Sequence, residues 1–160
     1  MGGRGGTGRN AVGRLIGQAL PSGDAPIEVH FVTDLNAAYQ EVSGDTLAQI
    51  SNVANAQYWY DAGEGVGHLF VKPGYSKGDI LHEYGHHLDE GRSYPKSWRN
   101  DVHNLIDQAA RHGRLGGDYY RRPAEFLANA FEKYQMARNK RKFRAENPEL
   151  ARAYDILVKK

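Results

Sequence analysis

Cysteine is absent from this chain of 160 residues. Without thiols the protein has no disulfide framework, no thiolate metal site and no cysteine nucleophile, so any metal must be held by histidine and carboxylate. The chain also lacks an apolar run long enough for a signal sequence or a membrane span, which makes a soluble, cytoplasmic protein the default expectation. Its formal net charge is only +2, so composition does not favour nucleic-acid binding by the whole domain.

The remaining composition is that of an ordinary globular protein, with 25% charged and 40% hydrophobic residues. A chain of this length can bury the core of one domain without disulfides. Residues 1–9 are rich in glycine and arginine and have no apolar anchor, which predicts a flexible arm. Residues 10–160 are therefore expected to form a single domain.

The spacing of apolar residues predicts an α+β fold, in which a small mixed or antiparallel sheet packs against several helices. Alternation predicts a strand over 27–33 and a hairpin over 57–72. Helical spacing and capping residues predict helices over about 10–20, 34–42, 46–55, 77–90 and 96–111, the last with Trp98 in the core, and further helices from Pro123 and from Pro148.

The most informative stretch is 82–89, His-Glu-Tyr-Gly-His-His-Leu-Asp. His82 and His86 are four residues apart, so on a helix they project from one face within reach of a single metal ion. In a His-Glu-x-x-His arrangement two neutral imidazoles hold zinc, and the glutamate, here Glu83, takes the proton of a water on the metal. The spacing therefore predicts a metal-dependent hydrolase, although two histidines flanking a glutamate also occur on solvated helices.

The sequence around these residues favours a helix over 77–90. Ser76 and Asp79 make a capping pattern at its start, and Gly91 suits the residue that follows its end. Gly85 lies in the middle of the helix, where it is less stable than alanine by about 1 kcal/mol. We therefore expect another part of the chain to approach the helix closely at Gly85.

The other polar residues near the motif have secondary interpretations. His87 lies about 100° round the helix from His86, so we expect it to be packed rather than a ligand. Asp89 either orients an imidazole of the metal site or pairs with Arg92 at the helix end. A metzincin would have glycine at position 89 and a ligand at 92, so that class is excluded. Three other histidines are interpreted as structural or solvated residues rather than ligands: His30, His103 and His112.

A second polar face is expected on the helix that begins near Pro123. Glu125 lies opposite the apolar face of this helix, together with Ala128, Asn129 and Glu132, and the small residues next to Glu125 would let another helix or a metal come near. A solvated glutamate in a first helical turn is also favoured by the helix dipole, so these residues alone leave the role of Glu125 open.

The blocks 82–89 and 124–131, the latter Ala-Glu-Phe-Leu-Ala-Asn-Ala-Phe, together resemble the gluzincins and, more narrowly, the catalytic domain of the anthrax-toxin lethal-factor-like metallopeptidases. This resemblance implies a zincin-like fold and a zinc ion held by His82, His86 and Glu125. It implies that Glu83 is the general base and that a tyrosine, either Tyr119 or Tyr120, stabilises the transition state. The expected activity is that of a zinc-dependent endopeptidase acting on a protein or peptide.

Several alternatives stay open at this level. The strand at 68–72 could be a free edge that pairs with an extended peptide, or an interior strand. The chain could be a catalytically silent zincin-fold module for interaction or assembly in a phage or mobile-element protein. Five of the seven residues 138–144 are basic; such a run is usually a solvated face, and nucleic acid is an unlikely partner. The sequence does not indicate the oligomeric state or the cleavage specificity.

Overall fold

The computed structural model describes residue 9 and residues 11–159. The expected flexible arm therefore lies outside the described residues, except for Arg9. Arg9 is helical, and its guanidinium lies 4.6 Å from the centre of the Phe31 ring. Residues 11–14 are helical and lead into the π-helix η1, Leu15–Ala19, which confirms the helix expected over 10–20 for residues 11–19; residue 10 lies outside the described residues.

Three strands form one mixed sheet: β1 (Ile27–Phe31), β2 (Ala56–Asp61) and β3 (Val66–Val71). Their order is β1-β3-β2, with β1 parallel and β2 antiparallel to β3. The predicted hairpin is confirmed as β2 and β3. Because β3 is the central strand, the stretch 68–72 is interior and offers no free edge; β2 is an edge strand instead.

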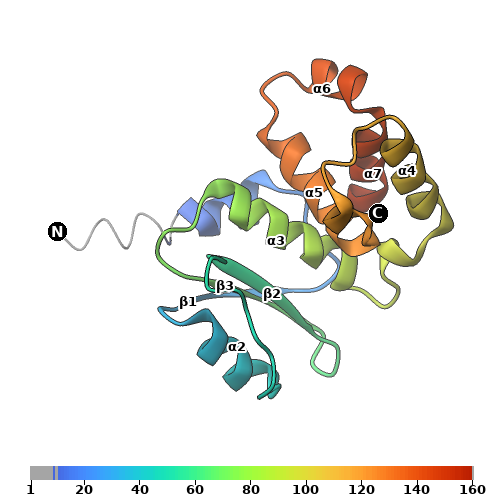
Figure 1. Cartoon of the computed structure of the whole chain (residues 1–160). Coiled ribbons are helices and arrows are strands. Elements are labelled where there is room, and N and C mark those ends of the chain that lie inside the picture. Colours follow the sequence, from blue (N-terminus) through green and yellow to red (C-terminus); the bar gives the residue numbers. More distant parts are fainter. Residues whose placement is uncertain (1–8, 10, 160) are drawn as a thin grey trace.

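Helices lie on both sides of this sheet (Figure 1). Helix α3 (Lys77–Glu90) covers one face, and α2 (Leu35–Ser43) lies against the other. Asp34 caps α2 as predicted, since its Oδ1 accepts a hydrogen bond of 3.0 Å from the Ala37 amide. Side chains that point toward α3 form a small core with it, made of Val12, Ala56, Leu69, Val71 and Ile80.

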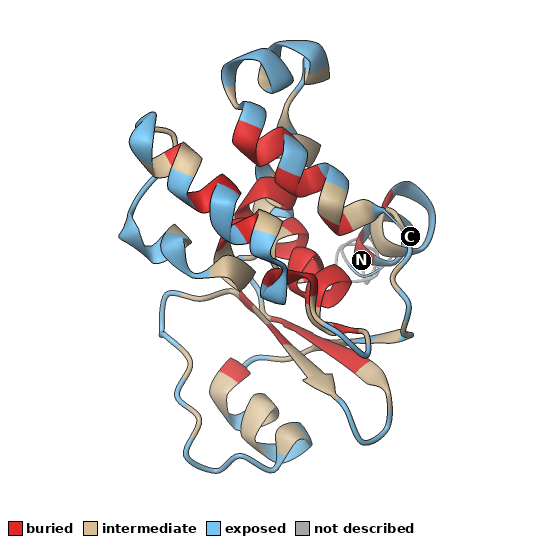
Figure 2. Ribbon diagram, turned by 90° about the vertical axis from the view of Figure 1, so that its right-hand side faces the viewer, coloured by how far each residue is buried: buried red, intermediate tan, exposed pale blue. Residues whose placement is uncertain are grey.

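The larger core lies between α3 and the helices of the second half of the chain. These are α4 (Asn100–Arg111), α5 (Pro123–Met136), the short α6 (Lys140–Glu146) and α7 (Pro148–Val158). Figure 2 shows buried residues concentrated where these helices meet α3. The fold is α+β, as predicted, and no helix among residues 9 and 11–159 has both the length and the apolar character needed to cross a membrane.

The helix expected over 46–55 was wrong, because this segment is a loop with turns. Its polar side chains bond to nearby backbone amides: Asp45 accepts from Leu47 at 3.1 Å, and Ser51 accepts from Val53 at 3.4 Å. Such local bonds offer the backbone an alternative to helical bonds. Apolar spacing alone therefore did not decide the conformation of this segment.

The helix expected over 96–111 is divided in two. A 3₁₀ turn, η2 (Lys96–Trp98), precedes α4, and Arg99 between them has an extended conformation with ψ of 141°. Trp98 was expected in the core but is 61% exposed. The break at Arg99 turns Trp98 away from the core-facing side of α4.

Candidate metal centre

Helix α3 is set by the residues that were expected to cap it. The Asp79 amide donates to Ser76 Oγ at 3.1 Å, and the Ser76 amide donates to Asp79 Oδ2 at 2.8 Å, which completes a capping box. At the other end the Gly91 amide donates to the His87 carbonyl. The helix bounds predicted over 77–90 are confirmed.

Helix α5 crosses α3 at Gly85. An ideal Cβ on Gly85 would lie 2.9 Å from Ala128 Cα and 3.3 Å from its carbonyl oxygen, so only glycine permits this separation of the two backbones. The expected close approach at Gly85 is confirmed, and α5 is the element that makes it. The crossing brings Glu125, in the first turn of α5, over the histidines of α3.

The three side chains expected to hold a metal meet at one point. Glu125 Oε1 lies 2.9 Å from His82 Nε2, and Glu125 Oε2 lies 3.2 Å from His86 Nε2. Two imidazoles and a carboxylate form a donor set that suits a catalytic zinc ion, which has three protein ligands. The residues present therefore fit the metal that the sequence implied.

The charges of this cluster are coupled. Burial lowers the pKa of His82, but hydrogen bonds to Glu125 and Glu132 outweigh it and raise the pKa to about 10. Burial favours the neutral form of Glu125, yet the bonds from His82 and His86 hold its pKa well below the ordinary value. Glu125 is therefore a carboxylate at physiological pH. The protonated, positively charged form of the His82 imidazole is favoured.

His82 is oriented by a residue to which the sequence assigned no role. Glu132 Oε1 lies 3.2 Å from His82 Nδ1, so it can accept the Nδ1 proton while Nε2 faces Glu125. Carboxylates often hold metal-binding imidazoles in this way. Glu132 lies seven residues after Glu125 and thus on the same face of α5, and this spacing was the signal that could have identified it.

Asp89 makes neither of the contacts expected of it. It is fully buried, and its Oδ1 accepts a hydrogen bond of 2.7 Å from the Ser97 amide, which fixes the turn at η2. Arg92 pairs instead with Asp24 at 3.7 Å. Of the two roles left open for Asp89, the contact with an imidazole is made instead by Glu132.

His87 is a packed side chain, as expected. Its Nε2 lies 3.1 Å from the Ala25 carbonyl oxygen, which can only accept, so Nε2 carries the proton. Its Nδ1 therefore accepts the hydrogen bond of 2.7 Å from the Tyr58 hydroxyl. The ring is enclosed by three glycines whose ideal Cβ atoms would lie within 3.0 Å of it, Gly23, Gly67 and Gly91.

Glu83 faces the sheet edge next to the cluster. Its Oε1 accepts a hydrogen bond of 2.9 Å from the Tyr58 amide. Burial raises the pKa of Glu83, although the charges of His86 and His82 oppose this shift. A raised pKa suits a carboxylate that must take up a proton and release it again.

Of the two candidate tyrosines, Tyr119 lies at the site. Partial burial, the charge of Glu125 and a hydrogen bond to Glu125 raise the pKa of Tyr119 to about 12, so its hydroxyl keeps its proton. Tyr119 and Glu83 line the same hollow of about 360 Å³. Tyr120 packs instead against the main hydrophobic core.

The hollow beside Glu83 follows the edge strand β2. It is bordered by Ala56 and Gln57 of β2, by Tyr39 of α2 and by the loop residues before β2. A second hollow of about 560 Å³ also borders β2 and includes Trp59 and Trp98. The Tyr58 amide points away from β3, toward Glu83. The strand beside the candidate site is thus β2.

Other parts of the chain that the sequence singled out lie elsewhere. His103 and His112 are exposed and lie outside the cluster of His82, His86 and Glu125. In the basic run, Lys140 Nζ donates to the Tyr134 and Gln135 carbonyls at the end of α5. Arg144 pairs with Asp155 at 2.8 Å. At these two positions the run stabilises the fold.

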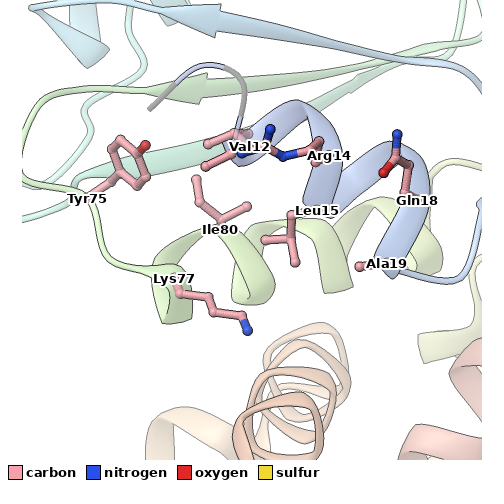
Figure 3. Close-up of a pocket in the computed structure, with 9 residues that line it drawn as sticks. Val12, Arg14, Leu15, Gln18, Ala19, Tyr75, Lys77 and Ile80 are labelled. Carbon is pink, nitrogen blue, oxygen red and sulfur yellow. The ribbon is translucent and has the colours of Figure 1, made fainter. Parts of the chain in front are cut away.

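A further hollow of about 500 Å³ lies between the first helical segment and the start of α3 (Figure 3). Its lining includes the apolar side chains of Val12, Leu15 and Ile80 and the basic side chains of Arg14 and Lys77. None of the residues of the His–Glu cluster lines it, so we assign it no part in the chemistry of that cluster.

Comparisons of the chain with protein-family models, with curated proteins and with solved structures found no match.

Proposed function

We propose that the chain is a zinc-dependent endopeptidase of the gluzincin type, built on a zincin-like fold. One observation carries the proposal: the two oxygens of Glu125 lie 2.9 and 3.2 Å from the Nε2 atoms of His82 and His86. These residues come from two helices, and the protein brings them together beside an exposed hollow. Two histidines on a solvated helix face would not be expected to share contacts with a carboxylate from a different helix, as His82 and His86 do with Glu125.

His82, His86 and Glu125 would hold the metal through Nε2, Nε2 and the carboxylate. When bound there, zinc would polarise the peptide carbonyl and make water more acidic. Glu132 would keep His82 in the tautomer whose Nε2 faces the metal site, because it accepts the Nδ1 proton.

Glu83 would act as the general base. The Tyr58 amide occupies Glu83 Oε1 and leaves Oε2 to take the proton of the attacking water. The same carboxyl group would then give the proton to the leaving nitrogen. The Tyr119 hydroxyl, protonated at neutral pH, would donate to the oxygen of the carbonyl as negative charge develops on it.

An extended peptide would bind along the outer edge of β2, which faces away from β3. The Tyr58 amide on this edge is already bonded to Glu83, so the remaining backbone groups of the edge would pair with a substrate strand, and the two hollows that Gln57 borders would receive its side chains. A peptide bound in this way would have a backbone amide bond, rather than a side chain, next to Glu83. This arrangement therefore supports peptide hydrolysis over hydrolysis of a small molecule.

The test combines metal analysis with a base variant. Glu83→Gln should keep about one zinc at this cluster and lose cleavage of a peptide library, because the amide cannot accept the proton. Glu41→Gln, a change at an exposed position of α2, should leave both zinc content and cleavage unchanged. Normal cleavage by Glu83→Gln would refute the assignment of the base.

Metal analysis of the wild-type protein, together with the cleavage assay, distinguishes the proposed endopeptidase from its main rival, a catalytically silent module. A protein that binds zinc at His82, His86 and Glu125 but cleaves no peptide in the library would be a silent zincin-fold module. A protein whose zinc content does not change when His82 and His86 are replaced by glutamine would refute the metal site.

A further inference from the structure

A second group of potential metal ligands lies on the sheet, away from α3. Glu28 and His30 are two residues apart on β1, so their side chains leave the same face of the sheet. His68 on β3 is the register partner of Glu28 and projects from that face too. This face is the one covered by α2. The residues whose side chains leave the opposite face pack in the core on the α3 side, namely Ile27, Val29, Leu69 and Val71.

The ligand atoms of these residues are spaced for a single ion. His30 Nε2 lies 2.9 Å from His68 Nδ1, and Glu28 Oε2 lies 3.9 Å from the former and 3.7 Å from the latter. A circle through three points with these separations has a radius of about 2.1 Å, which matches the length of a zinc–nitrogen or zinc–oxygen bond.

The rings are held in this orientation by aromatic neighbours. The His68 ring is stacked on Trp59 at 5.5 Å between centroids, and the His30 ring is stacked on Phe70 at 4.9 Å. His68 is only 8% exposed. Because the two imidazoles are already positioned, an ion would replace the proton they share without a large loss of side-chain freedom.

The carboxylate lies on the open side of the group. The Glu28 side chain is 62% exposed, so it can shift to complete a coordination shell, and solvent can supply a fourth ligand. Two imidazoles and one carboxylate favour zinc or a similar transition ion over calcium or magnesium, which prefer oxygen ligands.

We propose that Glu28, His30 and His68 form a second zinc site, which links β1 to β3. It shares no ligand with the cluster on α3 and α5, and it does not depend on peptidase activity. Its role is structural, because the ion would join two neighbouring strands of the sheet at residues about forty positions apart in the sequence.

The test is zinc stoichiometry and affinity in the full chain, measured by elemental analysis after dialysis and by competition with a chromophoric chelator. The wild-type protein should bind two zinc ions. His68→Gln should bind one, with at least a hundredfold loss of affinity at the second site, and Glu28→Gln should lose about tenfold. His103→Gln, at an exposed histidine of α4, should still bind two.

A variant of the first cluster makes the two sites separable. His82→Gln/His86→Gln should still bind one zinc ion, and zinc should raise its melting temperature. Adding His68→Gln to this variant should abolish both effects. The proposal is overturned if wild-type protein and His68→Gln bind the same number of zinc ions. If the variant with both His82 and His86 replaced does not fold, the zinc stoichiometries of the wild type and His68→Gln still test the proposal.

Discussion

Replacing Gly85 with alanine tests whether the crossing of α3 and α5 sets the metal site. The added Cβ would lie 2.9 Å from Ala128 Cα and 3.2 Å from Phe131 Cβ. Its main obstacle is the backbone of α5, which cannot rotate aside as a side chain can. The two helices would therefore have to separate by several tenths of an ångström at the crossing.

Two effects on stability oppose each other in this variant. Alanine is better than glycine inside a helix by about 1 kcal/mol, whereas overpacking a core contact costs about 1–3 kcal/mol. The net change in the free energy of unfolding should therefore lie between zero and a loss of about 2 kcal/mol. Gly13→Ala has no atom within 4 Å of its added Cβ, so this control should be neutral or stabilised.

The effect on zinc should be larger than the effect on folding. Glu125 lies one turn before Ala128, so separation of the helices moves its carboxylate away from His82 and His86. Functional sites need their groups held within about 0.5 Å, and we expect a loss of zinc affinity on the order of tenfold or more, which corresponds to about 1.4 kcal/mol. Chelator competition measures the affinity, and urea unfolding with EDTA measures the stability.

The reasoning would be refuted by one result in particular. If Gly85→Ala bound zinc as tightly as the wild type and gained as much stability as Gly13→Ala, the contact with Ala128 would not control the site.

Three further predictions follow from single contacts. Glu132→Gln weakens the acceptor for His82 Nδ1 and should lower zinc affinity by about tenfold, measured by chelator competition; an unchanged affinity would contradict the orienting role. Tyr58→Phe leaves His87 Nδ1 without its donor and should cost about 1–3 kcal/mol in urea unfolding, whereas Tyr60→Phe should change stability by less than about 0.5 kcal/mol. Burial lowers the pKa of His87 below 6.5, so its contribution to stability should be complete above pH 6.5 and decline as the pH falls toward the folded value. Unfolding with EDTA at several pH values should show this decline in the wild type and a weaker one in His87→Gln; equal slopes would refute it.

The elements that carry the site could be predicted from the sequence because their signals are local. Ser76 and Asp79 define the start of α3, and Pro123 marks the start of α5. Gly85 indicated a close contact, since a glycine within a helix is unfavourable without one. The partner in that contact and its distance depend on tertiary packing, which one sequence does not give.

The expectations that failed concern choices between competing contacts. Asp89 could bond an imidazole, a guanidinium or a backbone amide, and the turn at η2 places the Ser97 amide nearest. Strand order also could not be predicted, because β3 follows β2 in the chain while β1 pairs with β3 from a distant segment. The second cluster was missed for the same reason: His30 and His68 become neighbours only through that pairing.

Tyr58 shows how the rotation of α3 about its own axis is fixed. Its amide bonds Glu83 and its hydroxyl bonds His87, two residues that are four apart and therefore on one side of the helix. His82 and His86 each precede one of these residues, so their side chains lie about 100° away, on the side that faces α5. With β2 holding one side of α3 and the backbone contact at Gly85 holding another, the helix cannot turn without breaking buried contacts. The positions of His82 and His86 are thus set by packing on both sides of α3, and the proposed metal binding would require little rearrangement of the fold.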